Sequence, residues 1–215
     1  MKEITKTSRL AGQLEKLFGM LNADWFNGEL PTPIITIQST PRAYGHYSKF
    51  DAWSVKGEGR REINIGAGTL DRPIEYTIGT LQHEMCHMYN DLVLNAQDTS
   101  RGGTYHNRIF RDTAAAHGLT VTRSDKYGWS STAPADALLD WILDRDVCDI
   151  LMYRDEIHGI RIAGGNNTAN GGAPITGTVK TSSIRWHCPG CGAIVRSTRA
   201  LNIICGDCLA PFIAG

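Results

Sequence analysis

The segment His83–His87, with Glu84 inside it, constrains this chain more than any other part of the sequence. Two imidazoles four positions apart share one face only if the segment is an α-helix, and Glu84 is then displaced around the helix from His83. Both histidines can bind one zinc ion in that arrangement, while the carboxylate stays off the ion and can take a proton from the attacking water. The motif therefore predicts a zinc-binding helix of the kind found in zinc-dependent peptidases.

The residues around the motif favour a buried helix from Asp71 to about Leu94. Asp71 is a candidate N-cap, and Pro73 fits the first turn, where its missing N–H costs nothing. A core-facing stripe is formed by apolar residues at three- and four-residue steps, namely Ile78, Leu81, Met85, Met88 and Leu92. If no metal were bound, burying two histidines on either side of a buried glutamate would cost free energy. The stripe should thus face the core, with the histidines on an adjoining face.

A catalytic zinc site takes three protein ligands and keeps one position open. Asn90 and Val93 stand where a metzincin motif would continue with glycine and histidine, so that pattern is excluded. The candidates for the third ligand are His106 and His117, followed by Asp91 and Asp112. Asp91 is one helical turn beyond His87, where it is better placed to accept a hydrogen bond from a ligand than to bind zinc, and a solvated surface aspartate is the alternative.

The two histidine candidates differ in their surroundings. His106 follows a flexible polar stretch and opens an apolar helical pattern, so a ligand in the first turn of a helix against the motif helix is geometrically easy. His117 precedes Gly118, and a histidine followed by a left-handed glycine is an ordinary helix end. We therefore favour His106 as the third ligand.

Four cysteines near the C-terminus predict a second metal site of another kind. They form two paired knuckles, and such thiolates suit a closed tetrahedral zinc site: Cys188, Cys191, Cys205 and Cys208. Disulfides are the alternative. The first six residues lack the apolar core of a secretory signal, so a reducing cytoplasm is expected and disulfides are not favoured. Cys86 and Cys148 are predicted to pack as small hydrophobes.

Composition divides the chain into a larger domain at 1–162, a Gly- and Asn-rich flexible linker at 163–178 and a small zinc ribbon at 179–215. No run is apolar and long enough to span a membrane, and no nucleotide-cofactor motif is expected. The order of helix, strands and helices predicts an α+β fold, with a small sheet covering the zinc helices. The expected elements lie at 10–25, 34–37, 44–54, 62–65, 71–94, 106–116 and 136–143.

The charge gives a mixed indication about nucleic acid. Lysines and arginines number 22, and so do the acidic residues, so the whole chain shows no basic excess. The ribbon is locally basic and carries an aromatic residue beside its first knuckle, a combination that can follow a single strand and stack a base: Lys180, Arg185, Trp186, Arg196 and Arg199. Ordinary solvated surface charge is the alternative.

The whole pattern resembles the SprT-like zinc metallopeptidase family, to which Spartan-like proteases of DNA–protein crosslinks belong. The resemblance is carried by the leading helix that ends in 24–30, the strand after Pro33, the motif helix, His106 with Phe110, and the four-cysteine ribbon. It implies a zincin-like fold in which the motif helix packs on a small sheet. It also implies two zinc ions per chain, one of them held by three histidines, which here are His83, His87 and His106, with Glu84 as the base.

The function implied by the resemblance is a zinc-dependent endopeptidase that associates with DNA and acts on DNA-bound or DNA-crosslinked proteins. Its partners would be a protein substrate and single-stranded or damaged DNA, in the cytoplasm and, in a bacterium, at the nucleoid. Two alternatives stay open: a metallopeptidase with a dedicated protein substrate and no DNA role, and a non-enzymatic zinc-stabilised adaptor. The group that stabilises the oxyanion is unassigned, and Tyr89 and Tyr105 are candidates by sequence proximity alone.

Overall fold

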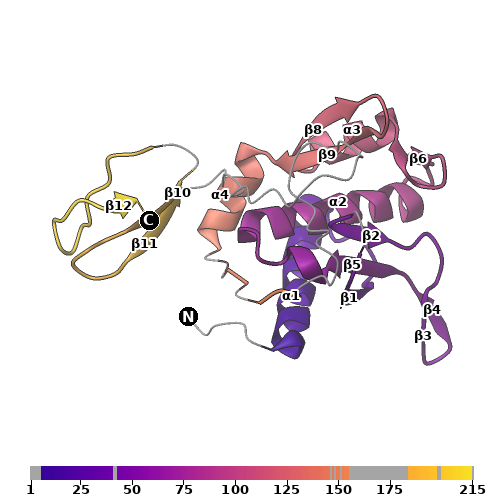
Figure 1. Ribbon diagram of the computed structural model, residues 1–215. Coiled ribbons are helices and arrows are strands. Elements are labelled where there is room, and N and C mark those ends of the chain that lie inside the picture. The colour runs from indigo at the N-terminus through magenta and orange to yellow at the C-terminus, as the bar shows by residue number, and fades with distance from the viewer. Residues whose placement is uncertain are drawn as a thin grey trace.

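The computed structural model describes residues 6–40, 43–145, 147, 149–150, 152–154, 184–197 and 200–214. The helices and most strands form one group, and a small three-stranded ribbon near the C-terminus lies beside it, beyond helix α4 (Asp136–Asp144) (Figure 1). The predicted linker at 163–178 lies outside the described residues, as do Cys148, Lys180 and Arg199. The predicted domain boundaries therefore stay predictions.

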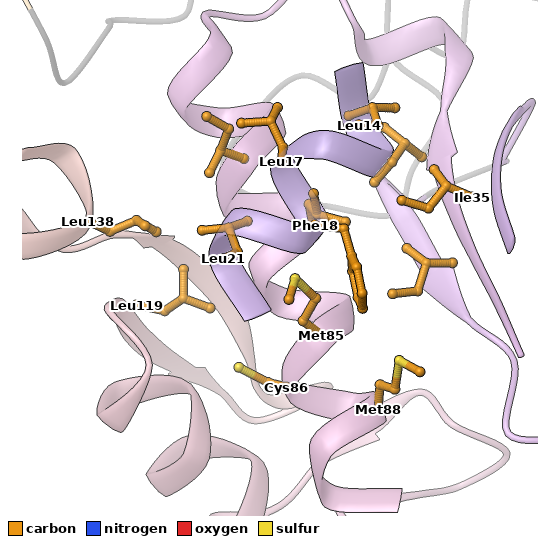
Figure 2. Close-up of a cluster of buried hydrophobic side chains, with 14 of the residues drawn as sticks. Leu14, Leu17, Phe18, Leu21, Ile35, Met85, Cys86, Met88, Leu119 and Leu138 are labelled. Carbon is orange, nitrogen blue, oxygen red and sulfur yellow. The ribbon is translucent and has the colours of Figure 1, made fainter. Parts of the chain in front are cut away.

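Helix α1 (Thr7–Trp25) supplies one side of the hydrophobic core. Its apolar residues recur every three or four positions, which puts them on one face, and that face is fully or almost fully buried: Leu10, Leu14, Leu17, Phe18 and Leu21. Figure 2 shows this face meeting Met85, Cys86 and Met88 of helix α2 (Ile74–Leu92). Each such leucine contributes about 1.5–3 kcal/mol by burial. The prediction that Cys86 packs as a small hydrophobe is confirmed, since it is 0% exposed.

The first sheet lies along one side of α2. Its order is β1 (Ile34–Gln38), β5 (Glu62–Gly66) and β2 (Gly45–Tyr47), with β5 parallel to β1 and antiparallel to β2. Strand β2 is thus an edge strand, and it packs against α2. A short hairpin of β3 (Trp53–Val55) and β4 (Glu58–Arg60) follows β2. A 3-10 turn, η1 (Ala67–Thr69), connects β5 towards α2.

The second layer lies on the other side of α2 (Figure 1). It consists of helix α3 (Arg108–Ala116) and a sheet in the order β6 (Thr99–Ser100), β7 (Tyr105–His106), β9 (Gly128–Pro134) and β8 (Leu119–Ser124). Gly79 of α2 allows β9 to approach closely, because a Cβ there would lie 3.0 Å from Pro134 Cγ. Helix α2 is therefore enclosed between two layers, and both can contribute residues to its middle.

The predicted α+β class is confirmed, and so are the leading helix, the strand at 34–38 and the helix at 136–144. Three local details were wrong. Helix α2 begins at Ile74 with Pro73 as its N-cap, so Asp71 does not cap it. Leu92, expected in the core stripe, is 38% exposed. His106 is not in the first turn of a helix but in β7, because the side chain of Asn107 caps α3 by accepting from the backbone N–H groups of Ile109 and Phe110.

The ribbon contains three strands in the order β11 (Ile194–Ser197), β10 (Ile184–His187) and β12 (Ile213–Ala214). Both partners of β10 run antiparallel to it. Two of its cysteines are buried, but most of its described residues are exposed. This agrees with a unit too small to be held together by a hydrophobic core. None of the described helices combines the length and apolarity needed to cross a bilayer.

Candidate active site and metal centres

The three predicted histidine ligands come together between the two layers. The Nε2 atom of His87 lies 3.2 Å from Nε2 of His83 and 3.0 Å from Nε2 of His106. Ligand nitrogens that bind one zinc ion tetrahedrally at about 2.0–2.1 Å lie about 3.3 Å from each other. The cluster therefore has the spacing of a three-histidine metal site, with α2 supplying two ligands and β7 the third.

The other ring nitrogens of His83 and His87 have partners that help to orient their Nε2 atoms, whereas Nδ1 of His106 is buried without a side-chain hydrogen-bond partner among the described residues. Nδ1 of His87 bonds Oδ2 of Asp98 at 2.5 Å, and Nδ1 of His83 lies 2.9 Å from the Thr132 hydroxyl. Burial, followed by the neighbouring His87 and His106, lowers the pKa of His83 well below its usual value. Burial, followed by the charge of His87, lowers the pKa of His106 to about 3. The lowered pKa values favour neutral imidazoles at His83 and His106, and a bound cation would occupy the point that the three Nε2 atoms share.

Asp98 is the carboxylate that orients a ligand, which corrects the expectation for Asp91. Asp98 is 0% exposed and accepts hydrogen bonds from His87, from Nζ of Lys49 at 2.7 Å and from Nδ2 of Asn90 at 3.0 Å. Burial alone would raise the pKa of Asp98, but these hydrogen bonds hold it well below the usual range. Asp91 instead accepts from the Tyr47 hydroxyl at 2.7 Å.

Glu84 directly follows His83 on α2, and its side chain faces β2. It is 4% exposed, and the backbone N–H of Tyr47 donates to its carboxylate. Burial, followed by the charge of Asp98, raises the pKa of Glu84 to about 8; a cation bound by the histidines would favour the ionised form. Gly45 makes room for this carboxylate, because a Cβ there would lie 3.2 Å from Glu84 Oε1 and 2.7 Å from the Asn64 carbonyl oxygen.

Phe110 closes the buried side of the histidine cluster. Its ring centroid lies 4.6 Å from that of His83, 4.5 Å from His87 and 4.6 Å from His106. The side chain is 0% exposed. Phe110 therefore fixes the three imidazole planes and keeps water from the back of the site.

The alternative ligands and the tyrosines considered from sequence lie elsewhere or have other contacts. His117 ends α3, and its ring stacks on Phe26 at 4.2 Å between centroids. The ordinary structural role predicted for it is confirmed. Tyr89 packs with the same two rings, at 5.6 Å and 5.1 Å. Tyr105 is covered by the guanidinium of Arg101 at 4.9 Å.

The four predicted cysteine ligands of the ribbon also come together. The ligand atoms of Cys188, Cys191, Cys205 and Cys208 lie within 4.8 Å of one another, and Sγ of Cys191 is 3.6 Å from Sγ of Cys205. Thiolates that share one zinc ion at about 2.3 Å lie about 3.8 Å apart. All four are free thiols, so the disulfide alternative is not supported. Backbone N–H groups, first that of Cys191, lower the pKa of Cys188 to about 7, which favours its thiolate.

The residues predicted to contact nucleic acid have different surroundings. Arg185 is exposed on β10. Trp186 is half-buried and donates from Nε1 to the Ser197 hydroxyl at 2.7 Å. Arg196 faces the larger group of elements, where its guanidinium pairs with Asp149 and lies 3.6 Å from Glu75. Arg196 is therefore already engaged by two carboxylates, and Lys180 and Arg199 lie outside the described residues.

Several supporting residues escaped the sequence analysis, namely Asp98, Thr132, Tyr47 and Gly45. Asp98 stands in a polar loop at the start of the stretch that precedes His106, and nothing local distinguishes it from Asp91. The other three reach the site only through the packing of β2 and β9 on α2. No family model, curated protein or solved structure matches this chain in the comparisons. The resemblance to SprT-like peptidases therefore stays a prediction.

Proposed function

We propose that this protein is a zinc-dependent endopeptidase. The observation that carries the proposal is the convergence of three imidazole Nε2 atoms, two of them from the helix that also carries the buried Glu84. His83, His87 and His106 would hold the zinc ion, which when bound polarises the scissile carbonyl and makes the attacking water more acidic. Cys188 and its three partner cysteines would hold a second, structural zinc ion.

Glu84 carries the proton in this proposal. Its carboxylate removes a proton from the water that attacks the peptide carbonyl carbon, and a C–O bond forms. The same proton then passes to the amide nitrogen as the C–N bond breaks, so that one water molecule yields a carboxylate and an amine. The hydrogen bond from the Tyr47 backbone N–H holds the carboxylate in place for both transfers.

Strand β2 offers a binding edge for the peptide. It is the terminal strand of its sheet and lies next to Glu84, so an extended peptide could pair with the outer main-chain groups of β2 other than the Tyr47 N–H that Glu84 occupies. Such pairing depends little on side chains, which suits an enzyme that accepts unfolded protein segments. A scissile bond in that strand would pass close to the histidine cluster.

Association with DNA is the second part of the proposal. Exposed Arg185, next to half-buried Trp186 on β10, can contact a backbone phosphate and a base. Together with the resemblance stated above, this favours a cytoplasmic peptidase acting on DNA-bound or DNA-crosslinked proteins. A dedicated protein substrate without a DNA role is the alternative enzyme, and an adaptor is disfavoured because Glu84 would have no use there.

Cleavage of an unfolded protein, with and without single-stranded DNA, separates these possibilities. The zinc-loaded chain should cleave it, DNA should accelerate cleavage, and Glu84→Gln should abolish it while both zinc ions remain bound. Cleavage that ignores DNA would support the dedicated peptidase. If the zinc-loaded chain cleaves nothing in either condition, the peptidase proposal is wrong.

A further inference from the structure

Arg72 has an unusual environment in the turn before α2. Its Nε donates to the Thr69 carbonyl at 2.8 Å, and one terminal nitrogen donates to the Thr80 hydroxyl at 3.1 Å. The guanidinium carbon lies 4.0 Å from the ring centroid of Tyr44. Neutral groups thus fix the guanidinium in one orientation, and burial lowers the pKa of Arg72 to about 10.

No carboxylate pairs with Arg72 among the described residues, which sets it apart from the other half-buried arginines. Arg60, Arg61, Arg111 and Arg196 each have a carboxylate oxygen within 4.0 Å. The carboxylate of the neighbouring Asp71 acts on this guanidinium only through space, and burial still lowers the Arg72 pKa, so Arg72 lacks the direct ion pair that the other four arginines have. Its second terminal nitrogen has no hydrogen-bond acceptor in the described part of the chain. The guanidinium is therefore held in one orientation, is cationic, and is able to bind an anion directly.

Thr80 connects this guanidinium with the candidate active site. The Thr80 hydroxyl accepts from Arg72, while its methyl group lies 3.0 Å from the point where a Cβ on Gly45 would be. Glu84 Oε1 lies 3.2 Å from that same point. Thr80 and Glu84 are one helical turn apart on α2. Arg72 and Glu84 therefore flank the same crossing of α2 and β2.

A peptide on the edge of β2 would pass both groups. Glu84 lies next to Gly45, and Arg72 lies over the ring of Tyr44, the residue before Gly45. We propose that Arg72 is a specificity-determining residue that binds a carboxylate of the peptide substrate, either an acidic side chain or the C-terminal carboxylate. The planar guanidinium fork suits a carboxylate, and Tyr44 keeps the fork flat. This inference rests on the proposed peptidase function and adds a substrate class to it.

The test compares matched peptides that differ only in charge. A host peptide carries one glutamate at each position in turn, its partner carries glutamine there, and both are made with a C-terminal acid or amide. We expect the wild-type kcat/KM to favour a carboxylate by about ten-fold or more at one position or at the terminus. The location of that preference distinguishes the acidic side chain from the C-terminal carboxylate.

The preference should follow Arg72. Arg72→Gln should bring the acid-to-amide ratio to about one, and Arg72→Lys should keep an intermediate ratio because it retains the charge without the fork. Arg145→Gln is the matched control, because Arg145 also lies over an aromatic ring, 4.2 Å from Trp141, but pairs with Asp24. It should keep the wild-type ratio. A wild-type ratio of about one for every peptide, or a full preference in Arg72→Gln, overturns the inference.

A binding measurement separates this inference from the peptidase proposal. In the Glu84→Gln background, fluorescence anisotropy gives the affinity for the same labelled peptides without turnover. An Arg72-dependent preference for the acidic peptide in a chain that cleaves nothing would keep the carboxylate site and reject the peptidase. Cleavage and binding that are both indifferent to peptide charge would keep the peptidase and reject the carboxylate site. Thermal unfolding of each variant shows whether a loss of activity or binding comes from misfolding. If Arg72→Gln misfolds, the acid-to-amide ratios of the wild type and of Arg72→Lys decide the question.

Discussion

Asp98 and His87 are joined by a 2.5 Å contact between Oδ2 and Nδ1, and this contact turns Nε2 of His87 towards the other two histidines. The pair links a loop to the middle of α2. Because Asp98 is 0% exposed and also bound by Lys49, its charge is fixed in position and adds basicity to the imidazole that would bind metal.

The first prediction concerns this pair. Asp98→Asn should weaken zinc binding at the histidine site by about 10–100-fold, because an amide cannot hold the His87 N–H with a full negative charge. Competition with a chromogenic chelator measures the affinity directly. Asp91→Asn is the control, since Asp91 contacts Tyr47 instead of a histidine, and its zinc affinity should match the wild type. Equal affinities for all three proteins would show that Asp98 does not support the site.

The second prediction concerns the number of metal ions. Elemental analysis should find two zinc ions per chain, one on the histidines and one on the cysteines. His106→Ala should lose the first ion and keep the second, while Cys188→Ser should do the reverse. Loss of the ribbon ion should also remove the ordered ribbon, because metal binding contributes most of the folding free energy of so small a unit. A chain that loses both ions in either variant would contradict two independent sites.

Local patterns in the sequence were enough to predict the helices and the convergence of the three histidines. They were not enough to predict the residues that orient those histidines. The spacing of His83 and His87 is a property of one helix, so it could be read without knowing the fold. Thr132 could not be recognised because it reaches His83, 49 positions earlier in the chain, only once β9 packs on α2. The same holds for Asp98, whose role depends on a loop folding back onto α2.

The prediction that His106 lies in the first turn of a helix was wrong for a more local reason. The apolar pattern after it is helical, and the sequence alone did not show that Asn107 would cap the helix one residue later. The cap leaves His106 in an extended conformation on β7, where its backbone N–H bonds the Tyr127 carbonyl at 3.0 Å. The side chain therefore reaches the other histidines from a strand, which holds it by main-chain hydrogen bonds.

The third prediction uses Gly45 to test the position of Glu84. Gly45→Ala places a methyl group 2.7 Å from the Asn64 carbonyl oxygen and 3.2 Å from Glu84 Oε1, so β2 or the carboxylate must move. We expect kcat/KM to fall by about 100-fold, the loss that a displaced catalytic group can cause, with little loss of zinc. Gly12→Ala in α1 is the control, because nothing lies within 4 Å of its new methyl group. That variant should be as active as the wild type and slightly more stable.

The last prediction concerns the contact between the ribbon and the larger group of elements. Arg196 on β11 lies 3.6 Å from Glu75, whose side chain is 2% exposed, and also pairs with Asp149. Arg196→Gln would leave the Glu75 carboxylate buried with less compensating charge, so the melting temperature of the whole chain should fall. Arg185, directly opposite on the neighbouring strand, is exposed, and Arg185→Gln should leave the melting temperature unchanged. If the two variants melt at the same temperature as the wild type, the ribbon is not held by Arg196 in solution. A lower melting temperature in Arg196→Gln alone would show that Arg196 pairs with the protein's own carboxylates in solution. Of the described residues predicted to contact DNA, Arg185 and Trp186 would then remain available.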